Sequence, residues 1–235
     1  MKIIDPPFYD LTTSNQEDKE KYLLILSEYG NIFTDFDQEE CQITKWKTGG
    51  WRRVEDGVSG GTTIGSFTLC WKDGEHFAIN SGVKDGHYQS GSLSLKDALK
   101  RLGEQEQQEQ DQYQQDQQDQ QDQVQQWAYC GNEINYHDDG SQLFISLDHP
   151  IILLVGKSQD PKNNDDIKPE DFRVFLVPGG MGVNINAGIW HSAPFAFYLD
   201  KQVNMLTKQG KVHSKIYYYP LKEDQSIFRF KVDSV

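Results

Sequence analysis

The sequence has few of the features that mark common kinds of functional site. Its three cysteines, Cys41, Cys70 and Cys130, are far apart and form no Cys-x-x-Cys pair, so neither a disulfide framework nor a cysteine zinc site is indicated. It contains no phosphate loop, no dinucleotide-binding glycine motif and no G-x-S-x-G serine motif. The sequence therefore favours a reducing compartment and excludes the best-marked nucleotide-binding and serine-hydrolase classes.

Basic charge and long apolar runs are also scarce. The formal net charge is −13, which argues against nucleic acid or an anionic membrane surface as a partner, because both require a basic patch. No stretch approaches the roughly 18 apolar residues of a membrane span, and the N-terminal MKIIDPPFYD has no apolar signal core. We expect a soluble, cytoplasmic protein whose partner is a small-molecule substrate.

One acidic tract carries much of the negative charge. Residues 104–126 are almost entirely Gln, Asp and Glu, and contain seven acidic residues but no Lys or Arg. Such a composition buries too little apolar surface to offset the entropy lost on ordering. The tract is predicted to be a disordered low-complexity insertion in a single domain of residues 1–235; a polyglutamine interaction helix is the alternative.

The remainder of the chain is patterned mainly as β-structure. Ser14 and Glu17 have the spacing of a capping box, and predict an N-terminal helix that ends at Gly30. Residues 66–71 and 75–79 flank Asp73-Gly74, the signal of a β-hairpin. Apolar residues at helical spacing over 95–102 predict a short helix before the acidic tract.

Short apolar runs separated by turn residues follow Trp127. We expect strands at 143–147, 151–155, 172–177, 194–199, 215–219 and 227–232. Because no helical pattern lies between them, they predict an antiparallel β-barrel or sandwich.

Two histidines are the strongest candidates for chemistry. His191 closes the pattern Gly188-x-x-His, which in small barrels of the cupin kind places an imidazole in the barrel mouth, and His137 precedes Gln142 by five residues, which resembles the first cupin motif. His137, Gln142 and His191 could therefore converge. Since they include no carboxylate to offset the charge of a divalent metal, we expect no certain cofactor, and any metal held by these three residues would be weakly bound.

These histidines also have simpler interpretations. His191 could be a hydrogen-bonded core residue beside Trp190, and His137 could belong to a polar turn with the motif Asp-Asp-Gly. His76, His149 and His213 are weaker candidates, because they lie in a hairpin, a turn and a basic segment.

Several separated stretches resemble the ureidoglycolate lyases, which release urea from ureidoglycolate in purine and allantoin breakdown. Gly182-Val183-Asn184 and Trp190-His191 match the two ends of that family's most specific motif, and His137 to Phe144 resembles its His-x-x-Gly-Thr-Gln strand. Tyr29-Gly30-Asn31-Ile32 and Ile79-Asn80-Ser81-Gly82 resemble two further family segments. The centre of this motif differs from the family pattern, since Asn186-Ala187 replaces the family's His-Arg. Residues 46–75 have no counterpart in the family.

The resemblance implies a cupin-like β-barrel or sandwich, a homodimer, and the conversion of ureidoglycolate to glyoxylate and urea. It assigns proton transfer to His137 and His191, and substrate binding to Asn80, Gln142, Asn184 and Trp190. The substrate carboxylate calls for an arginine, which Arg52, Arg53 or Arg173 could supply in place of the missing family arginine. Two alternatives remain: an enzyme acting on another small polar acid or sugar-like ligand, and a non-catalytic cupin-like binding or regulatory protein.

Overall fold

The structure, a computed structural model, describes most of the chain outside the acidic tract. The described residues are 2–42, 62–73, 75–79, 87–89, 93–94, 126–130, 133–137, 140–160, 167–210, 215–218 and 226–233. The predicted helix at 95–102, residues 104–125 of the predicted tract, and Arg52, Arg53, Asn80 and His213 lie outside them, whereas Gln126, the last residue of the tract, begins a strand.

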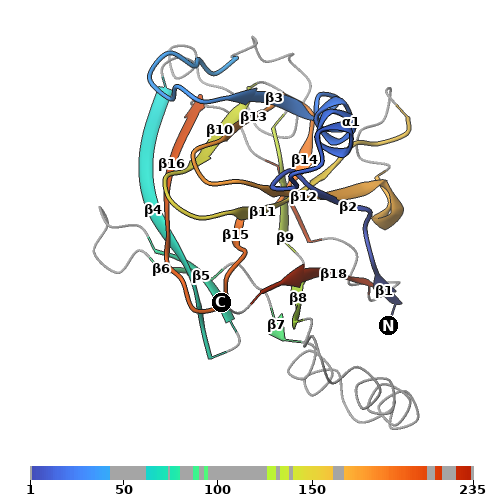
Figure 1. Cartoon of the computed structure of the whole chain (residues 1–235). Helices are drawn as coiled ribbons and strands as arrows, with labels where there is room; N and C mark the ends of the chain where they lie inside the picture. The colour runs from blue at the N-terminus through green and yellow to red at the C-terminus, as the bar shows by residue number, and fades with distance from the viewer. Residues whose placement is uncertain are drawn as a thin grey trace, which may run out of the picture.

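The described strands form three sheets (Figure 1). The upper sheet contains, in spatial order, β3 (Gly30–Phe33), β13 (Gly182–Ile185), β10 (Gln142–Ser146), β16 (Val203–Gly210), β4 (Thr62–Lys72), β5 (Glu75–Ile79) and β6 (His87–Gln89). The middle sheet contains β17 (Lys215–Tyr218), β9 (Glu133–Tyr136), β14 (Trp190–His191), β11 (Ile151–Gly156), β12 (Phe172–Val177) and β2 (Phe8–Asp10), with β15 (Phe195–Ala196) also paired to β11. The lower sheet contains β1 (Lys2–Ile4), β18 (Ser226–Val232), β8 (Gln126–Cys130) and β7 (Leu93–Ser94).

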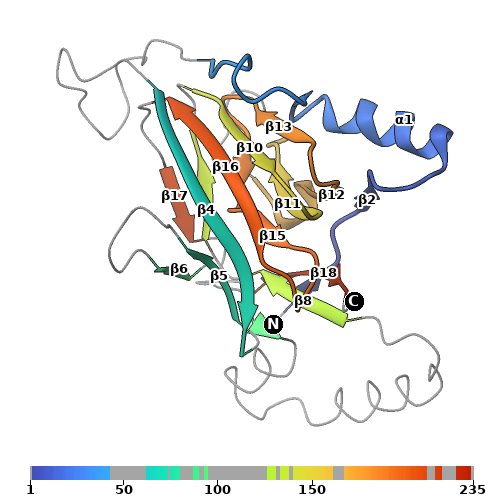
Figure 2. The ribbon, with the colours of Figure 1, turned by 60° about the vertical axis from the view of Figure 1, so that its left-hand side comes forward.

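The sheets are stacked as a sandwich and do not close into a barrel. Most neighbouring strands are antiparallel, whereas β1 pairs with β18 and β2 pairs with β12 in parallel. Figure 2 shows the two long strands β4 and β16 side by side across the upper sheet. The expected fold class is confirmed as mainly β with an N-terminal helix, and of the two expected architectures the open sheets fit the cupin-like sandwich.

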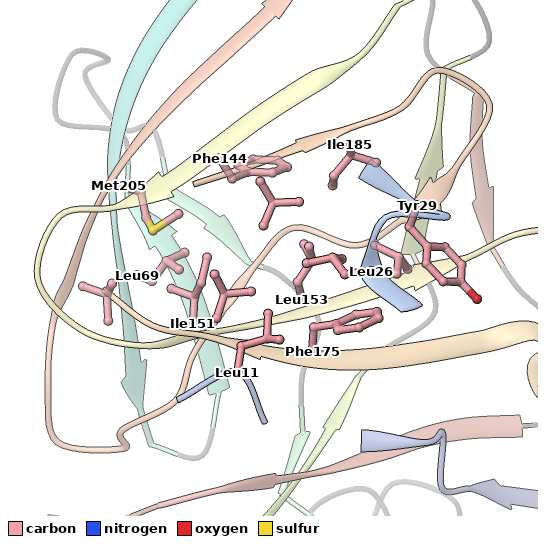
Figure 3. Close-up of a cluster of buried hydrophobic side chains, with 14 of the residues drawn as sticks. Leu11, Leu26, Tyr29, Leu69, Phe144, Ile151, Leu153, Phe175, Ile185 and Met205 are labelled. Atoms are coloured by element: carbon pink, nitrogen blue, oxygen red, sulfur yellow. The ribbon is translucent and has the colours of Figure 1, made fainter. Parts of the chain in front are cut away.

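The core has two main layers because the middle sheet is covered on both faces. Along β11, Ile151, Leu153 and Val155 pack toward the upper sheet, and Ile152 and Leu154 belong to the cluster shared with the lower sheet. All six residues of β11 are buried. A strand with two covered faces has a continuous apolar sequence, which explains why this run was easily predicted. Figure 3 shows the cluster between the upper and middle sheets.

The N-terminal helix is confirmed, but its predicted ends were wrong. Helix α1 spans Gln16–Leu26, and its cap is Asn15, whose side chain accepts hydrogen bonds from the backbone N–H groups of Glu17 and Asp18. Asparagine is as good a cap as serine, so the neighbouring Ser14 was not needed. Within the described residues, no helix is long and apolar enough to cross a membrane.

The predicted hairpin is confirmed as β4 and β5. Lys72 pairs with Glu75 across the turn, and Asp73 has a φ of 52°, the left-handed conformation that aspartate tolerates in such turns. Of the six strands predicted after residue 127, five match described strands to within one or two residues at each end. The run at 194–199 forms only the short β15. A short 3-10 turn, η1 (Pro169–Asp171), precedes β12.

Gly30 starts a strand and does not end the helix. It pairs with Ile185, and a Cβ at this position would lie 2.5 Å from the Asn184 carbonyl oxygen. We expect Gly30→Ala to lower the free energy of unfolding by about 1–3 kcal/mol, because this backbone contact cannot yield as a side chain would. Gly65→Ala is the control, since its Cβ would meet only Thr207 Cγ2, at 3.4 Å. Equal urea-unfolding midpoints for the two variants would contradict this prediction.

Candidate active site

Two residues of the site come from different sheets that face each other. His191 on β14 pairs with Val155 of the middle sheet, and Val155 packs toward the upper sheet. Gln142 begins β10 of the upper sheet and shares a face with Phe144, which belongs to the same core cluster as Val155. Opposed residues of antiparallel strands share a face, so the two side chains meet between the sheets. His191 Nε2 lies 3.0 Å from the Gln142 side-chain oxygen.

His137 joins this pair directly after β9. Its ring lies 5.1 Å from the His191 ring between centroids, at an interplanar angle of 80°. Its carbonyl oxygen accepts a hydrogen bond from the Gly188 N–H at 2.5 Å. The structure therefore brings together His137, Gln142 and His191, the three residues that the sequence pattern suggested could converge.

A short crossing segment explains the Gly-x-x-His spacing. Residues 186–189 carry the chain from β13 in the upper sheet to β14 in the middle sheet. Within it Gly188 has a φ of 85°, a conformation in which other residues are strained. The Asn186 N–H is anchored on the Tyr29 carbonyl oxygen at 2.9 Å. Glycine thus makes the turn that delivers His191 to the gap between the two sheets.

The hydrogen bonds of His191 determine its tautomer. Its Nδ1 lies 2.8 Å from the Ile189 carbonyl oxygen, which can only accept, so Nδ1 carries the ring proton. In a neutral imidazole Nε2 is then an acceptor, and its neighbour must be a donor. We therefore assign Gln142 the amide orientation that directs its NH₂ group toward His191, because amide nitrogen and oxygen exchange places by rotation. Its amide oxygen then points away from His191.

Both imidazoles are neutral at pH 7. Burial, followed by the repulsion that two protonated imidazoles, His137 and His191, would exert on each other, lowers the pKa of His137 to about 3. Burial lowers the pKa of His191 to about 4, although its bond to the Ile189 carbonyl opposes this shift. His137 Nδ1 is buried and, within the described part of the chain, has no hydrogen-bond partner. Such an atom costs stability unless something binds it, so it is the candidate position for a ligand at this site.

Two of the predicted substrate-binding residues lie elsewhere. Trp190 precedes His191 on the same strand and therefore faces the lower sheet, where it packs in the other core cluster. Asn184 pairs with Leu143, which faces away from Gln142, and its side chain donates to Glu39 Oε1 at 2.8 Å and to the Glu40 carbonyl oxygen at 3.2 Å. The structure thus does not bring Trp190 or Asn184 to the histidine pair.

The three converging residues fit a divalent metal poorly. Both ring nitrogens of His191 already have partners, so a metal would have to displace Gln142 from Nε2. No carboxylate belongs to the set, and among the described residues no group of three or more His, Cys, Asp or Glu side chains is placed to hold a metal ion.

Sequence reasoning missed the backbone groups of the site. The Ile189 carbonyl fixes the His191 tautomer, and the Gly188 N–H positions His137. Every residue carries these groups, so no residue type signals them. His76 was a weak candidate and is fully buried in another place, where its Nε2 accepts from the Ala196 N–H at 2.9 Å.

Comparison with known proteins supports the resemblance found in the sequence. The family model described as ureidoglycolate lyase matches residues 100–215, about half of the chain. A curated ureidoglycolate lyase of Azotobacter vinelandii is 33% identical over 75 residues, which cover 32% of this chain and 42% of that relative. The match thus spans less than half the length of the relative. Over residues 100–215, this chain is therefore similar to the ureidoglycolate lyases.

Proposed function

We propose that this protein is a ureidoglycolate lyase, which eliminates urea from ureidoglycolate to leave glyoxylate. The match of residues 100–215 to the ureidoglycolate lyase model supports the class of reaction. The observation that carries the proposal is the neutral His137, whose buried Nδ1 has no partner among the described residues and lies beside a second neutral imidazole of fixed tautomer. A group that moves protons at neutral pH needs an available lone pair, and His137 Nδ1 supplies one.

The reaction requires only one proton to move. Ureidoglycolate carries a hydroxyl and a ureido nitrogen on the same carbon. A base removes the hydroxyl proton, the C–O bond becomes a carbonyl, the C–N bond breaks, and the departing urea nitrogen gains a proton. Because both groups are attached to one carbon, the same imidazole nitrogen can take the proton from oxygen and return it to nitrogen. We assign this transfer to His137.

His191 and Gln142 have supporting roles in this proposal. His191 is held at both ring nitrogens and lies edge-on to His137, so it keeps the His137 ring in place without adding charge. With its NH₂ group on His191, Gln142 has an amide oxygen that can accept a hydrogen bond from the ureido N–H groups. Gln142 is partly exposed, so a substrate can reach it.

Glyoxylate release from purified protein tests this function. The protein is incubated with ureidoglycolate at pH 7, and glyoxylate is measured against the spontaneous decay of the substrate, with and without added divalent metal. We expect release well above the spontaneous rate in both conditions, because His137 and His191 act as neutral imidazoles. A rate no higher than spontaneous decay in either condition would rule the proposal out.

The altered motif centre favours a second candidate. Asn186-Ala187 stands where the family pattern has His-Arg, so this chain lacks a guanidinium at that place. An enzyme of the same fold acting on another small polar acid would fit that change. A thermal shift caused by such an acid, without glyoxylate release from ureidoglycolate, would favour this candidate or a non-catalytic binding protein over the lyase.

A further inference from the structure

We infer that Arg173 is the substrate-binding residue that holds the carboxylate of the acid bound beside the histidine pair. The inference rests on the proposed function for the identity of that acid. A carboxylate bound next to two neutral imidazoles needs a cation, and a bidentate guanidinium is the most effective one. Three observations on Arg173 support the inference: its face of the sheet, its hydrogen bonds and the positions of other cations.

Arg173 lies in the same cross-strand row as His191. Val155 of β11 pairs with His191 on one side and with Arg173 of β12 on the other. Phe175, two residues along β12, packs in the core cluster with Val155, so Arg173 belongs to the face toward the upper sheet. Adjacent strands are about 4.8 Å apart, which places the Arg173 and His191 backbones about 10 Å apart. The two side chains and a small acid bound between them together span this distance.

The guanidinium is positioned and still has free donors. Its Nη1 donates to the carbonyl oxygens of Glu170 at 2.8 Å and Phe172 at 2.7 Å. Within the described residues, Nε and Nη2 of Arg173 make no hydrogen bond. These two nitrogens form the edge of the guanidinium that binds a carboxylate with two parallel hydrogen bonds. Because Nη1 is already fixed on backbone, less conformational entropy is lost when an acid binds.

Two other cations of the sandwich, Arg229 and Lys208, are committed elsewhere. Arg229 forms an ion pair with Asp5 at the lower sheet. Lys208 pairs with Leu143, on the face of the upper sheet away from Gln142, and donates to the Phe36 and Glu39 carbonyl oxygens. Arg173, by contrast, lies near Tyr29, where its charge opposes the rise in pKa that burial causes. Since Tyr29 anchors the crossing segment, Arg173 lies at the same end of the sandwich as His191.

Two variants and a pair of probes test the inference. Arg173→Met removes the guanidinium, Arg173→Lys keeps the charge but cannot bind in a bidentate manner, and Arg229→Met is the matched control. The probes are oxamate, which has a carboxylate and an amide, and oxamide, which has a second amide in place of the carboxylate. The binding of each probe is measured by calorimetry. We expect Arg173→Met to weaken oxamate binding about 10- to 100-fold, Arg173→Lys to weaken it less, and oxamide binding to stay unchanged.

The outcomes distinguish this inference from the proposed function. Unchanged oxamate affinity in folded Arg173→Met or Arg173→Lys, or no oxamate binding to the unaltered protein, overturns the role of Arg173. If the unaltered protein binds oxamate through Arg173 but releases no glyoxylate from ureidoglycolate, the carboxylate site stands and the lyase proposal fails. In an active enzyme, Arg173→Met should raise the KM for ureidoglycolate about 10- to 100-fold, and Arg229→Met should leave it unchanged.

Discussion

Replacing His137 with phenylalanine should lower the rate of glyoxylate release by about 100- to 10,000-fold, the usual contribution of a proton-transferring side chain. The same change should leave the free energy of unfolding unchanged or raise it by about 1 kcal/mol, because His137 Nδ1 is buried with no partner in the described part of the chain. Steady-state kinetics and urea unfolding on the same preparation measure the two effects.

His76→Phe is the matched control for this variant. His76 is also buried, but its Nε2 accepts a hydrogen bond from the Ala196 N–H. We expect this variant to lose about 1–3 kcal/mol of stability because it leaves a buried donor unpaired, and to retain activity wherever it remains folded. If His137→Phe instead unfolds like His76→Phe, or keeps its turnover, His137 is a structural residue and the proposed mechanism is wrong.

Acid should destabilise the fold well above the pH at which carboxylates alone would do so. Burial lowers the pKa of His76 to about 3, of His137 to about 3 and of His191 to about 4, whereas an unfolded histidine has a pKa of about 6.5. Between these values the unfolded chain binds protons that the folded chain does not, so the free energy of unfolding falls as the pH falls. Full stability is present above about pH 6.5.

The slope of this loss can be measured residue by residue. Each buried histidine adds up to about 1.4 kcal/mol per pH unit between its folded and unfolded pKa values. Urea unfolding from pH 7 to pH 4 should therefore show a steep fall, and His137→Phe should make it shallower by one such contribution. Equal slopes in the unaltered protein and in His137→Phe would contradict the prediction.

The sequence predicted the members of the histidine site because their signals are local. The spacing from His137 to Gln142 and the Gly188-x-x-His191 pattern each lie within a few residues, and the structure brings both stretches together. The apolar runs of β11 and β12 were found for the same reason, since both are covered on two faces. Strand β16 was missed because lysine, glutamine and threonine interrupt its alternation.

The positions of Trp190 and Asn184 depended on which face of a sheet they occupy. Adjacent residues on a strand point in opposite directions, so a histidine that faces the gap between two sheets sends the preceding tryptophan to the other side. This rule could have been applied to Trp190 from the sequence alone. Asn184 could not be placed in this way, because its partners Glu39 and Glu40 are more than 140 residues away in the chain.

The contact between Gln142 and His191 depends on the thickness of the core layer between the two sheets. Gln142 and His191 belong to different sheets, and the bond between their side chains bridges the layer filled by residues such as Phe144 and Val155. Close-packed interiors respond to the gain or loss of a single methylene group by small shifts of the surrounding elements. A change of side-chain volume in this layer therefore alters the distance between His191 Nε2 and the Gln142 side chain. In this protein, apolar residues between the two sheets therefore set the alignment of His191 with Gln142.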